Sequence, residues 1–148
     1  MSDLLVVGIS DYKLAKYPNV PNVIVTYALG SCVGICLYDK QLKIGGLSHI
    51  MLPESSMFNK SDINRMKFAD TAIVDLVQDL LRHGADRRRL TAKIAGGAQM
   101  FEVQQGSSIG TIGDRNVVSV KKTLQSLMIP ILAEDTGLNY GRTVYFDL

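Results

Sequence analysis

Residues 23–51 read VIVTYALGSCVGICLYDKQLKIGGLSHIM, a stretch rich in Val, Ile and Tyr and interrupted by Gly, Ser and Asp. This composition predicts three strands, at 23–29, 33–38 and 44–51. Asp39-Lys40-Gln41 is suited to close a hairpin between the second and third strands, whereas Gly30-Ser31 makes a sharper break between the first and second. The stretch therefore predicts antiparallel strands, with Cys32 just past a bend.

Two helices are expected in the second half of the chain. Apolar residues recur at helical spacing from Ile63 onward, and Gly84 is placed to follow the C-terminus of that helix. A second helix would begin at Asp114, which suits an N-cap. The buried faces of the two helices are expected to carry Met66, Ala69, Ile73, Leu76, Val77, Leu80 and Leu81 in the first, and Val117, Val120, Leu124 and Leu127 in the second.

Further strands are expected at 4–9, 91–95, 129–133 and 143–147. Hairpin-compatible strands, followed by helices that alternate with single strands, predict an α+β fold built in layers, with mixed, largely antiparallel β-sheets flanked by two main helices. The sequence contains no repeat, low-complexity tract or linker rich in Pro, Ser or charge. We therefore expect residues 1–148 to form a single domain.

Charge and hydropathy exclude several classes of function. The 148 residues carry 16 Lys and Arg against 14 Asp and Glu, a net charge of +2, and the densest basic run is Arg87-Arg88-Arg89, so nucleic acid is not an expected partner. No apolar run approaches the roughly 18–20 residues that span a bilayer, and the N-terminus has Asp3 where a signal peptide carries basic residues. We expect a soluble, cytoplasmic protein without membrane insertion.

A thiol and an imidazole mark a candidate catalytic site. Cys32 follows Gly30-Ser31, a turn that is able to hold the thiol outward and expose backbone N–H groups for an oxyanion. His49 stands 17 residues later. With the hairpin turn near 39–41, positions 32 and 49 are about equally distant from it, so the two side chains are expected nearly opposite each other. Contact would lower the pKa of the thiol toward neutrality, and Thr26 is placed to orient the imidazole.

Other interpretations of these residues remain open. Cysteine in an apolar strand is commonly core, which is the interpretation of Cys36, and Thr and His in strands are commonly structural. Cys32, Cys36 and His49, with distant His83, offer metal ligands, but their spacing matches no usual zinc pattern. His83 is expected in the last turn of the first helix beside Gly84, where a favourable interaction with the helix dipole accounts for it.

No cofactor or metal is expected. The glycine-rich segment 96–113 contains neither the P-loop pattern nor the G-x-G-x-x-G pattern of nucleotide sites, and its glycines indicate tight turns and close backbone approach. Phe101, between Met100 and Glu102 in this segment, suits either a core position or an exposed anchor for a partner.

Four ordered motifs resemble those of the CheD family of chemoreceptor glutamine deamidases, and the match covers nearly the whole chain. The motifs are Val25-Thr26-Tyr27-Ala28-Leu29-Gly30-Ser31-Cys32-Val33, Ser48-His49-Ile50-Met51-Leu52-Pro53, Lys93-Ile94-Ala95-Gly96-Gly97-Ala98 with Met100-Phe101, and Ala133-Glu134-Asp135-Thr136-Gly137 with Asn139-Tyr140-Gly141-Arg142. The resemblance implies that Cys32 is the nucleophile, His49 the general acid/base and Thr26 the orienting group. It also implies a layered α/β sandwich similar in site geometry to glutamine-deamidating toxin domains.

The resemblance also implies chemoreceptors and a CheC-type phosphatase as partners, a location at receptor arrays, and Phe101 in a partner-contacting loop. Departures from the family pattern are small: Asp114 stands where Glu is frequent, Leu138 where a second Gly is common, and the sequence stops soon after Phe146. Two functions therefore stay open. One is a thioester-forming glutamine deamidase, which would also be able to cleave a glutamyl methyl ester, and the other is a non-catalytic regulator that binds receptors or the phosphatase.

Overall fold

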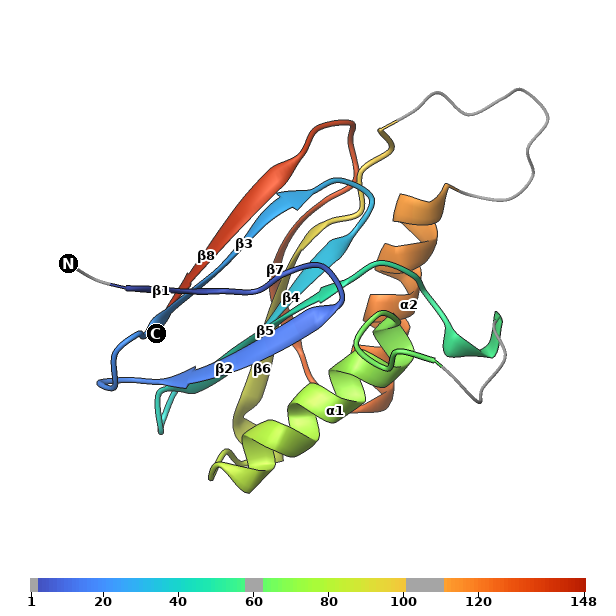
Figure 1. The fold of residues 1–148 in the computed structure, drawn as a ribbon. Coiled ribbons are helices and arrows are strands. Elements are labelled where there is room, and N and C mark those ends of the chain that lie inside the picture. Colours follow the sequence, from blue (N-terminus) through green and yellow to red (C-terminus); the bar gives the residue numbers. More distant parts are fainter. Residues whose placement is uncertain (1–2, 58–62, 101–110) are drawn as a thin grey trace.

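The computed structural model describes residues 3–57, 63–100 and 111–148, which form two β-sheets and two main helices (Figure 1). The smaller sheet has the strand order β1-β3-β8, and the larger has the order β2-β5-β4-β6-β7. Pairing is antiparallel except for β1 with β3 and β6 with β7. The strands are β1 (Leu4–Val6), β2 (Asp11–Lys16), β3 (Val23–Leu29), β4 (Val33–Asp39), β5 (Ile44–Ile50), β6 (Leu90–Gly96), β7 (Ile131–Thr136) and β8 (Arg142–Asp147).

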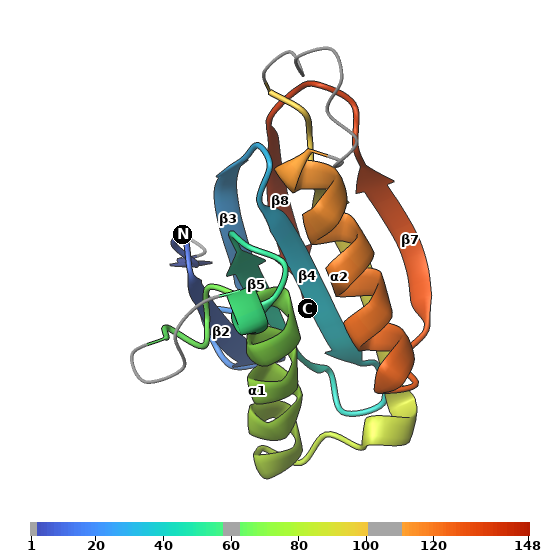
Figure 2. The same cartoon turned by 90° about the vertical axis from the view of Figure 1, so that its right-hand side faces the viewer.

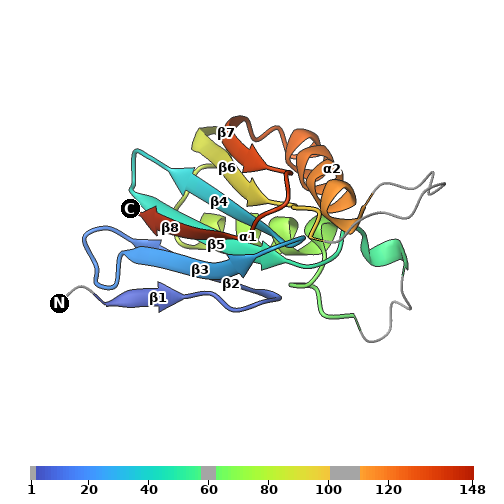
Figure 3. The ribbon, with the colours of Figure 1, turned by 90° about the horizontal axis from the view of Figure 1, so that it is seen from above.

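Helices α1 (Ala69–Arg82) and α2 (Ile112–Ser126) cover one face of the larger sheet (Figure 2). The smaller sheet packs on the other face, and Figure 3 shows β1 and β3 side by side in that layer. Short 3-10 helices occur at η1 (Ser55–Met57) and η3 (Arg87–Arg89). The order of layers is therefore small sheet, large sheet, helices, which confirms the expected layered α+β fold.

Two hydrophobic cores fill the spaces between these layers, and β4 contributes to both. Val33, Ile35 and Leu37 alternate toward the helices, while Cys36 packs with Leu47 between the sheets. This is the period-2 alternation of a strand with apolar neighbours on both faces. Every residue of β5 is buried, because this strand lies between β2 and β4 and is covered on both sides.

Some element boundaries differ from those that the sequence predicts. Strand β2 was not expected, and the strand predicted at 129–133 lies at β7. Helix α1 begins at Ala69 rather than near Ile63, because Phe68 is extended at the N-cap position. The N-cap of α2 is Thr111, whose Oγ1 accepts the N–H of Asp114 at 3.2 Å, so the prediction of Asp114 as the cap was wrong.

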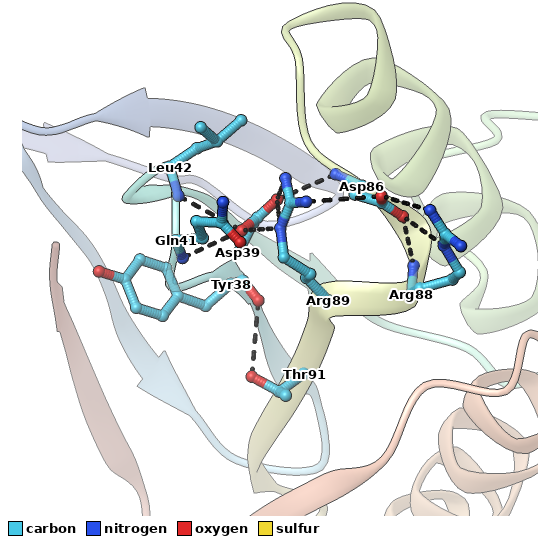
Figure 4. A network of polar contacts seen from close by, with 8 residues as sticks. All are labelled: Tyr38, Asp39, Gln41, Leu42, Asp86, Arg88, Arg89 and Thr91. Atoms are coloured by element: carbon cyan, nitrogen blue, oxygen red, sulfur yellow. Dashed lines mark hydrogen bonds and ion pairs between the residues drawn. The ribbon is translucent and has the colours of Figure 1, made fainter.

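A buried carboxylate fastens the β4–β5 hairpin to the start of β6 (Figure 4). The carboxylate of Asp39 accepts two guanidinium N–H groups of Arg89, with Nη2 at 2.9 Å from Oδ2, and the backbone N–H of Asp86 at 2.9 Å. Burial alone would raise the pKa of Asp39, but the bonds from Arg89 and from the backbone of Asp86 and Leu42 lower it to about 2. Asp39 is therefore ionised and fully paired inside the protein.

Within the described residues, no helix is long and apolar enough to cross a membrane.

Candidate active site

His49 lies on β5 and faces the smaller sheet, where it meets Thr26 of β3. Both side chains are buried, and Thr26 Oγ1 lies 2.7 Å from His49 Nδ1. Since β3 and β5 belong to different sheets, this contact joins the two layers. The predicted pairing of Thr26 with the imidazole matches this geometry.

The partners of Thr26 fix the tautomer of His49. Thr26 Oγ1 also donates to the carbonyl oxygen of Val7 at 2.8 Å. A hydroxyl has a single proton, and a carbonyl oxygen only accepts. Thr26 Oγ1 must therefore accept from His49, which places the imidazole proton on Nδ1 and leaves a lone pair on Nε2. Nε2 is buried and has no hydrogen-bond partner among the described residues, so it is available as a base.

Cys32 immediately precedes β4, beside the strand that carries His49. Gly34 pairs with His49 and Val33 with Ile50, so the register places Cys32 two positions from the residue opposite His49. The expectation that positions 32 and 49 are nearly opposite was therefore wrong by two residues, because the hairpin closes between Asp39 and Ile44 rather than around 39–41. Cys32 lies at a bend just outside β4, so the thiol and the imidazole are carried at the same end of two neighbouring strands.

Burial sets the protonation of both groups. It raises the pKa of the Cys32 thiol, although the backbone N–H of Cys32 lowers it in part, and it lowers the pKa of His49. The resting pair is therefore a neutral thiol beside a neutral imidazole. This corrects the expectation of a thiol pKa lowered toward neutrality by an imidazolium. Catalytic hydrogen bonds of free enzymes commonly tighten when substrate binds, so proton transfer from Sγ to Nε2 belongs to the bound state.

The turn before Cys32 is held by the segment that follows β6. The N–H of Ala98 donates to the carbonyl of Gly30 at 2.9 Å, and the N–H of Gly97 donates to the carbonyl of Cys32 at 2.8 Å. This close approach requires glycine at position 96, where φ is +113° and a Cβ would lie 2.2 Å from the Cys32 carbonyl oxygen. The expected role of the segment's glycines in close backbone approach is confirmed at Gly96, while Gly106 and Gly110 lie outside the described residues.

The remaining candidates of the sequence lie apart from this site. The thiol of Cys36 packs between the sheets, and burial raises its pKa to about 12. His83 caps the C-terminus of α1, with Nδ1 2.8 Å from the carbonyl oxygen of Asp79. Across residues 3–57, 63–100 and 111–148, no cluster of His, Cys, Asp or Glu is suited to hold a metal ion. Phe101 lies outside the described residues.

Comparisons with known proteins identify the family. Residues 51–148 match the family model described as CheD chemotactic sensory transduction. Over 147 residues the chain is 50% identical to "Probable chemoreceptor glutamine deamidase CheD" of Syntrophomonas wolfei, covering 99% of this chain and 89% of that protein. This chain belongs to the CheD family.

Two other CheD relatives are equally extensive. Identity is 54% over 143 residues with the Moorella thermoacetica protein of the same printed name, covering 96% of this chain and 83% of the relative. It is 47% over 146 residues with "Chemoreceptor glutamine deamidase CheD" of Bacillus licheniformis, covering 99% and 85%. The resemblance to the CheD family inferred from the motifs is thus confirmed.

A solved structure resembles the fold of this CheD chain. The Bacillus licheniformis hypothetical protein YfiH superposes with a TM-score of 0.54 at 13% identity, covering 87% of this chain and 51% of that one. This likeness shows a shared fold, and the CheD chain spans about half the length of the YfiH protein.

Proposed function

We propose that this CheD-family chain is a chemoreceptor glutamine deamidase in which Cys32, His49 and Thr26 perform the chemistry. The observation that carries the proposal is the proton arrangement at His49. Thr26 accepts the Nδ1–H bond, and Nε2 keeps a free lone pair on β5, the strand that neighbours the turn carrying Cys32. A nucleophile beside a base that a third group orients is the arrangement that acyl transfer requires.

In the first half-reaction, Cys32 Sγ attacks the carboxamide carbon of a receptor glutamine while its proton passes to His49 Nε2. The carbonyl oxygen becomes an oxyanion, which backbone N–H groups at the Gly30-Ser31-Cys32 turn stabilise. The C–N bond then breaks, and the proton on Nε2 goes to the departing nitrogen. The products are ammonia and a thioester between Cys32 and the glutamyl side chain.

Water completes the reaction by the same route. His49 Nε2 takes a proton from the water that attacks the thioester carbon, and the C–S bond breaks. The thiol of Cys32 recovers its proton, and the receptor side chain leaves as glutamate. Thr26 accepts the Nδ1–H bond throughout, because His49 keeps that proton in both its neutral and its charged form. No metal or cofactor enters these steps.

The substrate implies one partner, and the resemblance to the CheD family implies a second. Chemoreceptors supply the glutamine, and we propose that this substrate brings the protein to receptor arrays. We also propose that a CheC-type phosphatase binds the protein there, and that residues 1–148 act as one domain. The names of the relatives support the first partner, since the Bacillus licheniformis and Syntrophomonas wolfei proteins are both named as chemoreceptor glutamine deamidases.

The experiment incubates the protein with a purified cytoplasmic fragment of a chemoreceptor and measures ammonia together with peptide masses. Deamidation replaces NH2 by OH, so modified glutamine peptides gain about 1 Da, and the Cys32→Ala protein should produce no such shift. Receptor binding without any mass shift would instead support the non-catalytic regulator. Release of methanol from a methylated fragment would reveal the methylesterase reaction.

A further inference from the structure

Asn116 on α2 is a fully buried polar side chain at the edge of the candidate site. Its Nδ2 donates to the carbonyl oxygens of Ser31 and Met51, both at 2.9 Å. Because both partners are carbonyl oxygens that only accept, the amide nitrogen must face them. Asn116 thus ties the turn before Cys32 to the chain that follows His49.

The bond to Ser31 determines where the backbone N–H of Cys32 points. The carbonyl of Ser31 and the N–H of Cys32 belong to one planar peptide unit, and in a trans peptide the two groups point in opposite directions. Since the carbonyl faces Asn116, the N–H faces away from α2. In the preceding peptide unit, the Gly30 carbonyl is held by Ala98, so the N–H of Ser31 is likewise directed away from Ala98.

Among the described residues, these N–H groups have no backbone acceptor. Within the part of the chain that the structure describes, neither the N–H of Ser31 nor that of Cys32 donates to a carbonyl. The backbone N–H of Cys32 lowers the pKa of its own thiol, against the larger effect of burial, which raises it. Two adjacent backbone donors beside a nucleophilic sulfur are the groups that hold the oxygen of a tetrahedral intermediate.

The amide oxygen of Asn116 indicates that this side chain acts through the two hydrogen bonds that its Nδ2 donates. Oδ1 is buried and has no partner among the described residues. A buried acceptor without a partner is destabilising, whereas an apolar side chain of similar size avoids that cost. The buried Oδ1 of Asn116 is therefore unfavourable for stability, while the two bonds from Nδ2 orient the turn.

We propose that Asn116 is a positioning residue that presents the backbone N–H of Cys32 to the oxyanion formed on the substrate carbonyl, next to the N–H of Ser31, whose peptide unit is held by Ala98. This inference rests on the proposed function in that it takes Cys32 as the nucleophile. Without the Nδ2 donors the Ser31–Cys32 peptide is free to rotate. The thiol and the imidazole remain in place, but the oxyanion loses the N–H of Cys32 as a donor.

Two reactions of Cys32 separate this role from a structural one. Alkylation by iodoacetamide displaces iodide at a tetrahedral carbon and forms no oxyanion, whereas acylation by p-nitrophenyl acetate passes through one. Both rates would be measured by mass spectrometry in a Cys36→Ala background, so that a single thiol reacts. Asn116→Ala should lower the acylation rate about tenfold or more and change the alkylation rate less than about twofold.

The matched control is Ser119→Ala, which removes a buried donor of the same helix that bonds the Pro53 carbonyl at 2.7 Å. It should leave both rates unchanged, and thermal melts would verify that each variant is folded. If Asn116→Ala does not fold, Asn116→Asp, which has the same size but loses both donors when ionised, is measured in the same way. Equal losses of acylation and alkylation, or no loss of either, would overturn the proposal.

Neither reagent requires a receptor, so this test is independent of the proposed substrate. Absence of ammonia release from receptor fragments would refute deamidation, while the ratio of the two Cys32 rates would still decide the role of Asn116.

Discussion

Thr26 Oγ1 and His49 Nδ1 lie 2.7 Å apart, and this bond crosses from the smaller β-sheet to the larger one. Because Thr26 gives its own proton to the Val7 carbonyl, the bond has a direction, from His49 to Thr26. The packing of the two sheets therefore fixes the tautomer of His49 in which Nε2 is able to act as a base.

Replacing Thr26 tests this arrangement. Thr26→Val keeps the shape but leaves the Val7 carbonyl and His49 Nδ1–H without their partner, at a stability cost of about 1–3 kcal/mol. Deamidation should fall on the order of tenfold, whereas Thr26→Ser, which keeps the hydroxyl, should retain most activity. The deamidation rate of His49→Ala should fall further, by a factor of about 10²–10⁴. A loss in Thr26→Val as large as that of Cys32→Ala, in a folded protein, would contradict a purely orienting role.

The two cysteines should behave oppositely. Cys32→Ala should abolish deamidation, while Cys36→Ala should leave it largely intact, because burial raises the pKa of Cys36 to about 12 and keeps that thiol protonated between the sheets. Ammonia release from a receptor fragment is the measurement. Comparable losses in the two variants would disprove the assignment of Cys32 as the nucleophile.

Burial of His49 should make stability depend on pH. Its folded pKa lies below the usual value of about 6.5, so the unfolded chain binds more protons as pH falls below that value. The stability contribution is complete above about pH 6.5 and is lost, at up to about 1.4 kcal/mol per pH unit, as pH falls through the folded pKa.

Urea unfolding between pH 8 and 5 would measure this loss. His49→Asn, whose amide is able to donate to Thr26 but does not titrate, should show a shallower dependence. Equal slopes would show that His49 is not the group responsible.

Asp39 should contribute stability at a different pH. Its pKa falls from 3.8 to about 2, so its contribution, about 2 kcal/mol, is complete above about pH 4 and is lost as pH falls through 2. Asp39→Asn should lower the free energy of unfolding at pH 7 and flatten this acid dependence. Arg88→Ala removes an exposed ion pair with Asp86 beside the same network and should have no measurable effect. An Asp39→Asn protein as stable as wild type would show that the pair contributes nothing.

How far the sequence predicts this molecule depends on which contacts are local. The strand at 23–29 and the candidate side chains Thr26, Cys32 and His49 follow from composition and spacing. The register of Cys32 against His49 does not, because it depends on a hairpin loop whose length turn-forming residues alone leave open. Strand β2 carries the alternation of Tyr12 and Leu14 between polar residues, a signal that its charges obscure.

The position of Asn116 in the apolar pattern of α2 is a signal in the sequence that a search for catalytic motifs misses. It stands four residues before Val120 and eight before Leu124 on the buried face of α2. A polar residue within an apolar helical stripe signals a buried hydrogen-bonding role. Its partners, however, lie 85 and 65 residues away along the chain, which no local pattern specifies.

The parallel pairing of β6 with β7 has a consequence for synthesis of the protein. Parallel neighbours need a connection that crosses the sheet, and here that connection contains α2. Thr26, Cys32 and His49 all emerge from the ribosome long before Asn116 does. A nascent chain that ends before α2 therefore contains every reacting side chain but lacks Asn116, which holds the turn before Cys32. Full activity would require that α2 has also been synthesised.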